Sequence, residues 1–374
     1  MHILVMQQHV PGQISFCWLA VWRDGQRRRS IKSGGCGVTD GDVFELGDVR
    51  LQSGATLRTA RLVYRTYGRL NGQGDNAILV PTFYGGRHVD YEGMIGSGHA
   101  LDPERYFIVV VNMFCNGLSS SPSNTPSPCN GPKFPSVTHW DNVHCQHRLL
   151  TQHLGVRRLA LATGFSMGGQ QASHWAAIFP DMVQRLAPWC ASARTAPHNW
   201  VFLEGVKAAL LADPDFNGGW YRHAPQRGIR AFARVWAGWG PSQAFYRDAL
   251  YRVLGHASPD DHMTAFWEAN FLQFDANDLL GMLTTWQRSD ISDNPLYRGD
   301  YPAALRAITA KTMLLPGATD LYFPVADNEW QLQHMRDAEL RPIPSDWGHI
   351  AGAPGLHAPD MAFLDTALRD LLAR

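Results

Sequence analysis

The chain has 374 residues, of which 45% are hydrophobic and 18% are charged, a composition typical of a globular protein. Its 33 basic residues balance its 33 acidic ones, so the charge favours neither nucleic acid nor an anionic membrane as a partner. Six cysteines without a CxxC pair do not form a disulfide framework in so long a chain, and we expect a reduced, cytoplasmic protein.

The first 38 residues are predicted to be a poorly packed extension. Their apolar run, "ISFCWLAVW" (14–22), is too short to span a membrane. The basic residues follow this run, whereas a signal peptide carries them before it. No other segment approaches the length of a transmembrane helix, so no membrane is expected as a partner.

Strand and helix patterns alternate from residue 42 to residue 192. Residues 42–68 alternate between apolar and polar around a turn at Ser53-Gly54, which predicts a β-hairpin. Buried strands are then expected within 76–86, 105–114, 157–163 and 185–192, and helices over 138–155 and 167–179. This order predicts an α/β fold with a mostly parallel sheet, helices on both faces and the hairpin at one edge.

The pattern changes between residues 195 and 306, which show helical segments rich in aromatic residues and no strand pattern. Strands and helices alternate again from residue 310, ending in a helix over 359–373. We therefore predict a core of residues 39–194 and 307–374 with a helical lid, 195–306, inserted late in the sheet. A separate helical domain is the alternative interpretation of this segment.

One short motif indicates a catalytic residue. "GFSMG" (164–168) follows an apolar strand and precedes a helix, and it matches the G-x-S-x-G pattern of a nucleophile elbow. Such a tight turn exposes the serine hydroxyl and brings the flanking residues so close that only glycine fits. Ser166 is therefore the predicted nucleophile; a plain glycine-rich turn is the alternative.

A serine needs a base and an acid that orients the base, and in this type of sheet they follow the serine in the order acid, then histidine. Asp320 and His349 each follow a predicted strand in that order, close to glycines. Asp320 could instead cap the helix near Pro324. Asp327 is a weaker candidate acid, and His357, at a helix start, a weaker candidate base.

The tetrahedral intermediate of such a reaction needs two N–H donors for its oxyanion. The backbone N–H of Met167 is the first predicted donor, because it directly follows the nucleophile. The second is expected from the "PTFYGG" loop (81–86), where Phe83 is preferred and Tyr84 is the alternative.

Other sequence patterns give weaker evidence for a functional site. His144, His147, His153 and Cys145 lie on one predicted helix, but no further ligand completes a tetrahedral metal site, so no metal is expected. No phosphate-binding GxxxxGK[ST] loop occurs, and no bound cofactor is expected.

These residues resemble the α/β-hydrolase fold and, more narrowly, the homoserine O-acetyltransferase-like family. The matching segments are "FPSVTHWDNV" (134–143), "GFSMGGQQA" (164–172), "ADPDFNGGWY" (212–221), "GATDLYFP" (317–324) and "GHIAG" (348–352). The resemblance implies that Ser166, Asp320 and His349 are nucleophile, acid and base, and that the lid can form a homodimer contact.

The chain departs from true homoserine acetyltransferases in two loops, 81–86 and 112–126, and in the early lid. There the family holds the homoserine carboxylate with an arginine, whereas "NWVFLEGVKAAL" (199–210) offers only Lys207. We therefore expect a serine hydrolase that cleaves a small acyl substrate, such as a carboxylic ester, through an acyl-enzyme on Ser166. The alternatives are an O-acyltransferase with acetyl-CoA as co-substrate and the same triad, and a non-catalytic binding protein.

Overall fold

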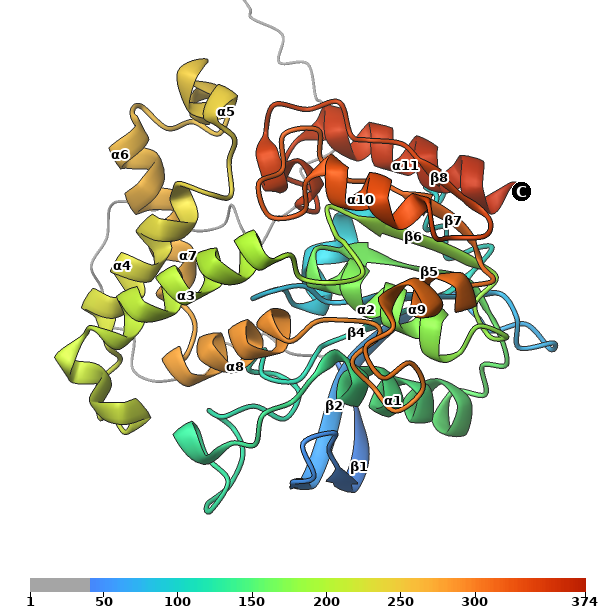
Figure 1. The fold of residues 1–374 in the computed structure, drawn as a ribbon, viewed down its shortest axis with the longest axis horizontal. Helices are drawn as coiled ribbons and strands as arrows, with labels where there is room; N and C mark the ends of the chain where they lie inside the picture. Colours follow the sequence, from blue (N-terminus) through green and yellow to red (C-terminus); the bar gives the residue numbers. More distant parts are fainter. Residues whose placement is uncertain (1–40) are drawn as a thin grey trace, which may run out of the picture. The chain divides into compact units, whose positions relative to one another are not determined.

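The computed structural model describes residues 41–374, and the predicted extension over residues 1–38 lies outside them. Eight strands form one sheet in the order β1-β2-β4-β3-β5-β6-β7-β8 (Figure 1). The strands are β1 (Asp42–Arg50), β2 (Thr56–Tyr67), β3 (Ala77–Pro81), β4 (Phe107–Val111), β5 (Leu159–Phe165), β6 (Arg185–Trp189), β7 (Lys311–Leu314) and β8 (Ala338–Leu340). The strands from β4 to β8 pair in parallel, while β1 pairs with β2, and β2 with β4, antiparallel. The predicted fold class, including the antiparallel hairpin at one edge, is confirmed.

The central strands are apolar because both of their faces are covered. Every residue of β3, β4 and β5 is buried, which explains why these segments are continuous apolar runs without alternation. The core helices are α1 (His139–Arg148), α2 (Met167–Ile178), α10 (Val325–Leu332) and α11 (Ala358–Leu372). Helix α9 (Tyr301–Ala307) lies at the end of the segment predicted as a lid, but it packs on α2 of the core. Helix α2 packs on β5 and β6 beside α1, and α11 packs against β6 and β7.

The predicted helix over 138–155 begins and ends close to its expected bounds. Thr138 caps α1, since its side chain accepts the N–H of Asp141 while the Asp141 carboxylate accepts the N–H of Thr138. After Arg148 the chain continues as a short π-helix, Leu149–His153. The cap, together with Gly155 beyond the end, accounts for the accuracy of this prediction.

The segment predicted as a lid is helical and lies between β6 and β7 in the chain. Its main helices are α3 (Pro197–Leu211), α4 (Gln226–Ala237), α5 (Gln243–Arg247), α6 (Pro259–His262), α7 (Ala269–Phe271) and α8 (Ala276–Gln287). Figure 1 shows them gathered beside the sheet, on the left of the view. Helix α3 packs against α4 and α8 within this segment, and the segment's 3₁₀ helix Pro214–Gly219 contacts the 3₁₀ helix Gly131–Lys133 of the core.

Among residues 41–374, no helix combines the length and the apolar character needed to cross a membrane.

Candidate active site

Ser166 occupies a strained turn between β5 and α2. Its backbone has φ 54° and ψ −123°, a conformation that non-glycine residues rarely adopt. Two hydrogen bonds hold it: its N–H donates to the Trp189 carbonyl at 3.0 Å, and its carbonyl accepts the Gln170 N–H at 3.0 Å. Because strand β6 and helix α2 both hold this backbone, the turn keeps its geometry.

The glycines around Ser166 are required by close contacts. A Cβ atom on Gly164 would lie 2.7 Å from the carbonyl carbon of Gly168. One on Gly168 would lie 2.4 Å from the carbonyl oxygen of Pro81. Both clashes are with backbone atoms, which cannot rotate away. The two glycines of the G-x-S-x-G motif are therefore required because no side chain fits at either position, as predicted.

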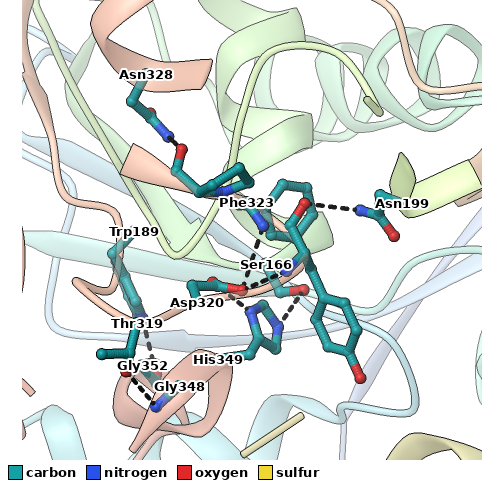
Figure 2. Close-up of polar contacts among 12 residues, drawn as sticks. Ser166, Trp189, Asn199, Thr319, Asp320, Phe323, Asn328, Gly348, His349 and Gly352 are labelled. Atoms are coloured by element: carbon teal, nitrogen blue, oxygen red, sulfur yellow. Dashed lines mark hydrogen bonds and ion pairs between the residues drawn. The ribbon is translucent and has the colours of Figure 1, made fainter. Parts of the chain in front are cut away.

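The structure brings Ser166, His349 and Asp320 together (Figure 2). His349 Nε2 lies 3.0 Å from Ser166 Oγ, and His349 Nδ1 lies 2.8 Å from Asp320 Oδ2. The other carboxylate oxygen of Asp320 accepts the backbone N–H groups of Tyr322 at 2.8 Å and Phe323 at 3.2 Å. All three side chains are buried. The arrangement is a nucleophile, an imidazole and an orienting carboxylate in hydrogen-bonding sequence.

Aromatic rings and one backbone bond hold the imidazole of His349. The Phe165 ring stacks on it at a centroid distance of 4.7 Å, and the Tyr322 ring meets it edge-on at 4.8 Å. The His349 N–H donates to the carbonyl of Gly240, in the loop after α4, at 2.8 Å. The base is therefore positioned by the core and by the lid segment together.

The weaker candidates lie elsewhere. Asp327 is on α10 and makes no hydrogen bond or ion pair with His349 among the described residues. His357 is the N-cap residue of α11, where its ring stacks on Trp347 and its Nδ1 lies 2.8 Å from Asp360. Asp320 does not cap α10, whose N-cap is Pro324 without a side-chain hydrogen bond. The geometry thus favours the preferred residue in each case.

The two predicted oxyanion donors lie on segments that adjoin the turn at Ser166. Met167 is the first residue of α2, and Phe83 follows β3, with its ring against Phe165 at 5.0 Å. Within residues 41–374, neither backbone N–H has a hydrogen-bond acceptor. Tyr84, the alternative, packs its ring on Trp236 at 5.0 Å, and its hydroxyl donates to the carbonyl of Leu279 at 2.8 Å. Its side chain thus connects the core to the lid segment.

Tyr91 is a further residue of the site that no sequence pattern predicts. Its buried hydroxyl accepts the N–H of Phe165 at 3.1 Å and donates to the carbonyl of Pro81 at 3.3 Å. It therefore connects the end of β3 to the residue before the nucleophile. The residue lies in a short 3₁₀ helix, His88–Met94, that has no periodic pattern or motif to mark it.

The histidines of α1 and of the π-helix that follows it do not converge on one point. Each histidine contacts its own partner: the carbonyl of Trp140 for His144, the ring of Phe179 for His147 and the hydroxyl of Tyr64 for His153. Burial also raises the pKa of the Cys145 thiol to about 12 and disfavours the thiolate that a metal needs.

A second cysteine lies beside the triad. Among the described residues, Cys190, Asp320 and His349 bring three possible metal-ligating atoms within 4.8 Å of one another. The imidazole and the carboxylate already bond to each other, and burial raises the pKa of the Cys190 thiol well above its usual range. This donor set suits an acid–base pair better than a metal site.

The fold and this buried constellation define the class. Residues 78–354 match the α/β-hydrolase fold family, to which the chain belongs. It is an esterase-like α/β-hydrolase enzyme.

Within this fold family, the chain is similar to particular esterases and to acetyltransferases. The chain is 38% identical to an ethyl acetate hydrolase from Pseudomonas veronii over 335 residues, which cover 89% of this chain and 95% of the relative. The solved structure of the acetyl esterase MekB has a TM-score of 0.87 at 37% identity and covers 90% of this chain and 97% of its own. A homoserine O-acetyltransferase from Chlorobium chlorochromatii is 32% identical, covering 80% and 87%. The expected resemblance is confirmed, with acetyl esterases more similar than this acetyltransferase.

Proposed function

We propose that the protein hydrolyses esters of short carboxylic acids, acetate foremost, through an acyl-enzyme on Ser166. The observation that carries this proposal is the buried chain of contacts from Ser166 through His349 to Asp320 at a strained strand–helix turn. The relatives named as an ethyl acetate hydrolase and an acetyl esterase support acetate as the acyl group.

In the first half of the reaction, Ser166 Oγ attacks the ester carbonyl carbon while His349 Nε2 accepts the hydroxyl proton. The carbonyl electron pair moves to its oxygen, which the N–H groups of Met167 and Phe83 stabilise. Asp320 holds the Nδ1–H of the imidazolium. The intermediate then releases the alcohol, which takes the proton from His349 Nε2, and the acyl group stays on Ser166.

In the second half, a water molecule attacks the acyl carbon and His349 Nε2 accepts its proton. The new tetrahedral intermediate expels Ser166 Oγ, which recovers the proton, and the carboxylic acid leaves. The reaction needs no group beyond these side chains and backbone donors.

The early lid supports water rather than homoserine as the acyl acceptor. The lysine of α3, Lys207, lies 3.2 Å from the Glu204 carboxylate, and both side chains are more than a third exposed. A cation already paired at the surface is poorly placed to bind a substrate carboxylate, and α3 contains no arginine that could form a bidentate pair. This feature favours hydrolysis over transfer to an amino acid.

The test is turnover of 4-nitrophenyl acetate by the wild type, Ser166→Ala and Ser173→Ala. Ser173 is a matched control, because it is a buried serine of α2, the helix that follows Ser166, and its hydroxyl donates to the Gly169 carbonyl. We expect Ser166→Ala to lose at least about a thousandfold in kcat, and Ser173→Ala to keep turnover within about threefold.

A second arm supplies acetyl-CoA with homoserine. Release of CoA that depends on homoserine and on Ser166 would show an acyltransferase instead. Ester turnover that persists in Ser166→Ala would overturn the assignment of the nucleophile.

A further inference from the structure

Three hydrogen-bond donors are buried without a partner in one part of the molecule. They are the hydroxyl of Tyr322 and the indole N–H groups of Trp236 and Trp286, and none has an acceptor within residues 41–374. The three side chains are 1%, 5% and 0% exposed. Buried polar groups are normally hydrogen-bonded, because leaving one unpaired is costly. Three such donors together therefore call for an acceptor that the polypeptide does not supply.

The three rings form one cluster between the lid segment and the core. The ring centroids of Trp236 and Trp286 each lie 5.6 Å from that of Tyr322, and they lie 5.6 Å from each other. Trp236 belongs to α4, Trp286 to α8, and Tyr322 to the core loop after β7. Contacts between rings are weak partners for N–H and O–H groups, so this packing leaves the donors available.

This cluster borders the catalytic base. Tyr322 is two residues beyond Asp320, and its ring meets the ring of His349 at 4.8 Å. Its backbone N–H donates to Asp320, and its carbonyl accepts the side-chain N–H of Asn199, from α3, at 3.2 Å. The backbone of Tyr322 is thus fixed to the triad on one side and to the lid segment on the other.

We propose that Tyr322, assisted by Trp236 and Trp286, forms a subsite for an oxygen atom in the alcohol part of the ester substrate. This rests on the proposed function. The ester carbonyl oxygen lies at Met167 and Phe83, whereas His349 returns its proton to the departing alcohol. Groups packed against His349 therefore border the alcohol.

The surroundings of the subsite define the class of alcohol. The Phe202 ring lies 4.7 Å from the Tyr322 ring and 5.3 Å from the Trp236 ring, so the donors are set in an apolar, aromatic wall. Such a wall suits a short carbon chain that carries one ether or carbonyl oxygen. A site built around donors discriminates against an analogue that lacks the acceptor, because its donors then stay unpaired.

Two acetates of equal size test this subsite: 2-methoxyethyl acetate and butyl acetate, which differ by an ether oxygen in place of one methylene group. The measured quantity is the ratio of their kcat/KM values, compared between the wild type and Tyr322→Phe. We expect this ratio to fall by about three- to tenfold in Tyr322→Phe, which is the effect of one lost hydrogen bond. The two alcohols differ in leaving ability, but that difference is common to both proteins and cancels in the comparison.

Tyr297→Phe is the matched control, since the hydroxyl of Tyr297 donates to the carbonyl of Ala177, near the end of α2 remote from Ser166. It should leave the ratio unchanged. Trp286→Phe keeps an aromatic ring without the N–H and provides a second test if Tyr322→Phe folds poorly; it should lower the ratio in the same direction.

An unchanged ratio in both Tyr322→Phe and Trp286→Phe would overturn the subsite, since a buried water would then serve these donors. A ratio that changes only for an acyl-side pair, ethyl methoxyacetate against ethyl butanoate, would overturn its placement at the alcohol. If neither acetate is hydrolysed in a Ser166-dependent manner, the proposed function itself fails, and this result differs from loss of the subsite alone.

Discussion

His349 Nε2 lies 3.0 Å from Ser166 Oγ, although 183 residues separate the two in the chain. The serine is held by β5 and α2, and the histidine lies in a short 3₁₀ helix, Gly348–Gly352, well beyond β8. The whole segment from α3 to β8 lies between them in sequence. The contact therefore forms only when the parts of the core that precede and follow the lid segment in the chain have packed together.

Replacement of Asp320 by asparagine should abolish most of the activity without unfolding the protein. Oδ1 of Asp320 accepts two backbone N–H groups, so the introduced amide would keep its oxygen there and turn its NH₂ group toward His349 Nδ1. This fixes the imidazole with its proton on Nε2, where it can no longer accept the proton of Ser166. We expect kcat for 4-nitrophenyl acetate to fall by about 10⁴-fold with little change in Tm.

Asp327→Asn is the control for this experiment, since Asp327 lies on α10 and makes no hydrogen bond or ion pair with His349 among the described residues. It should retain near wild-type kcat. A larger loss in Asp327→Asn than in Asp320→Asn would exchange the two assignments.

Two glycine-to-alanine changes should have opposite effects. In Gly168→Ala the new methyl group would meet the carbonyl oxygen of Pro81 at 2.4 Å, so the elbow must shift. We expect loss of activity and of about 2–4 kcal/mol in the free energy of unfolding. Gly205→Ala, in α3, meets nothing within 4 Å and should stabilise the protein by about 0.5–1 kcal/mol.

Urea denaturation and ester turnover of both glycine variants check this prediction. Equal stability of the two proteins would show that the elbow tolerates a side chain at residue 168.

The fold and the site could be predicted best where one local physical requirement, such as burial or steric space, determines both the residue type and the spacing. The buried strands could be predicted because strands covered on both faces need apolar residues throughout, and the elbow because glycine alone fits at 164 and 168. The order of serine, acid and histidine then identified Asp320 and His349, which the structure places in contact.

The features that could not be predicted from the sequence depend on contacts between segments that are distant in the chain. Strand β8 is only three residues long, and His349 lies nine residues past its end, where a bond to Gly240 helps to position it. The sequence around Tyr91 does not indicate that its hydroxyl connects β3 to the elbow. The sequence around Tyr322 does not indicate that its hydroxyl has no partner among the described residues. Such roles follow from packing between segments that are distant in the sequence, which no periodic pattern encodes.

Tyr91→Phe should weaken the elbow without removing any group of the triad. Its hydroxyl is both the acceptor for the Phe165 N–H and a donor to Pro81, and its loss leaves a buried N–H unpaired. We expect a loss of about 1–3 kcal/mol in the free energy of unfolding and a lower kcat at nearly constant KM. Thermal denaturation and steady-state kinetics measure both, and unchanged values would show that the bond to Phe165 is dispensable.

Asp278 should make the stability of the protein depend on pH. This buried carboxyl of α8 accepts the N–H and the hydroxyl of Ser123, and burial is the main cause that raises its pKa to about 7. In the unfolded chain its pKa is about 3.9. Between about pH 4 and pH 7 the folded protein thus keeps a proton that the unfolded chain has lost, so the free energy of unfolding falls as the pH rises through this window.

Asp278→Asn removes that cost, because the amide stays neutral and its oxygen can still accept the Ser123 N–H. We expect the variant to exceed the wild type by about 1–3 kcal/mol in the free energy of unfolding at pH 8, and the gain to shrink toward pH 5. Urea denaturation at the two pH values measures this difference. Asp215→Asn, at an exposed position, should show the same small effect at both. A gain for Asp278→Asn that is equal at pH 5 and pH 8 would mean that Asp278 does not titrate in this range.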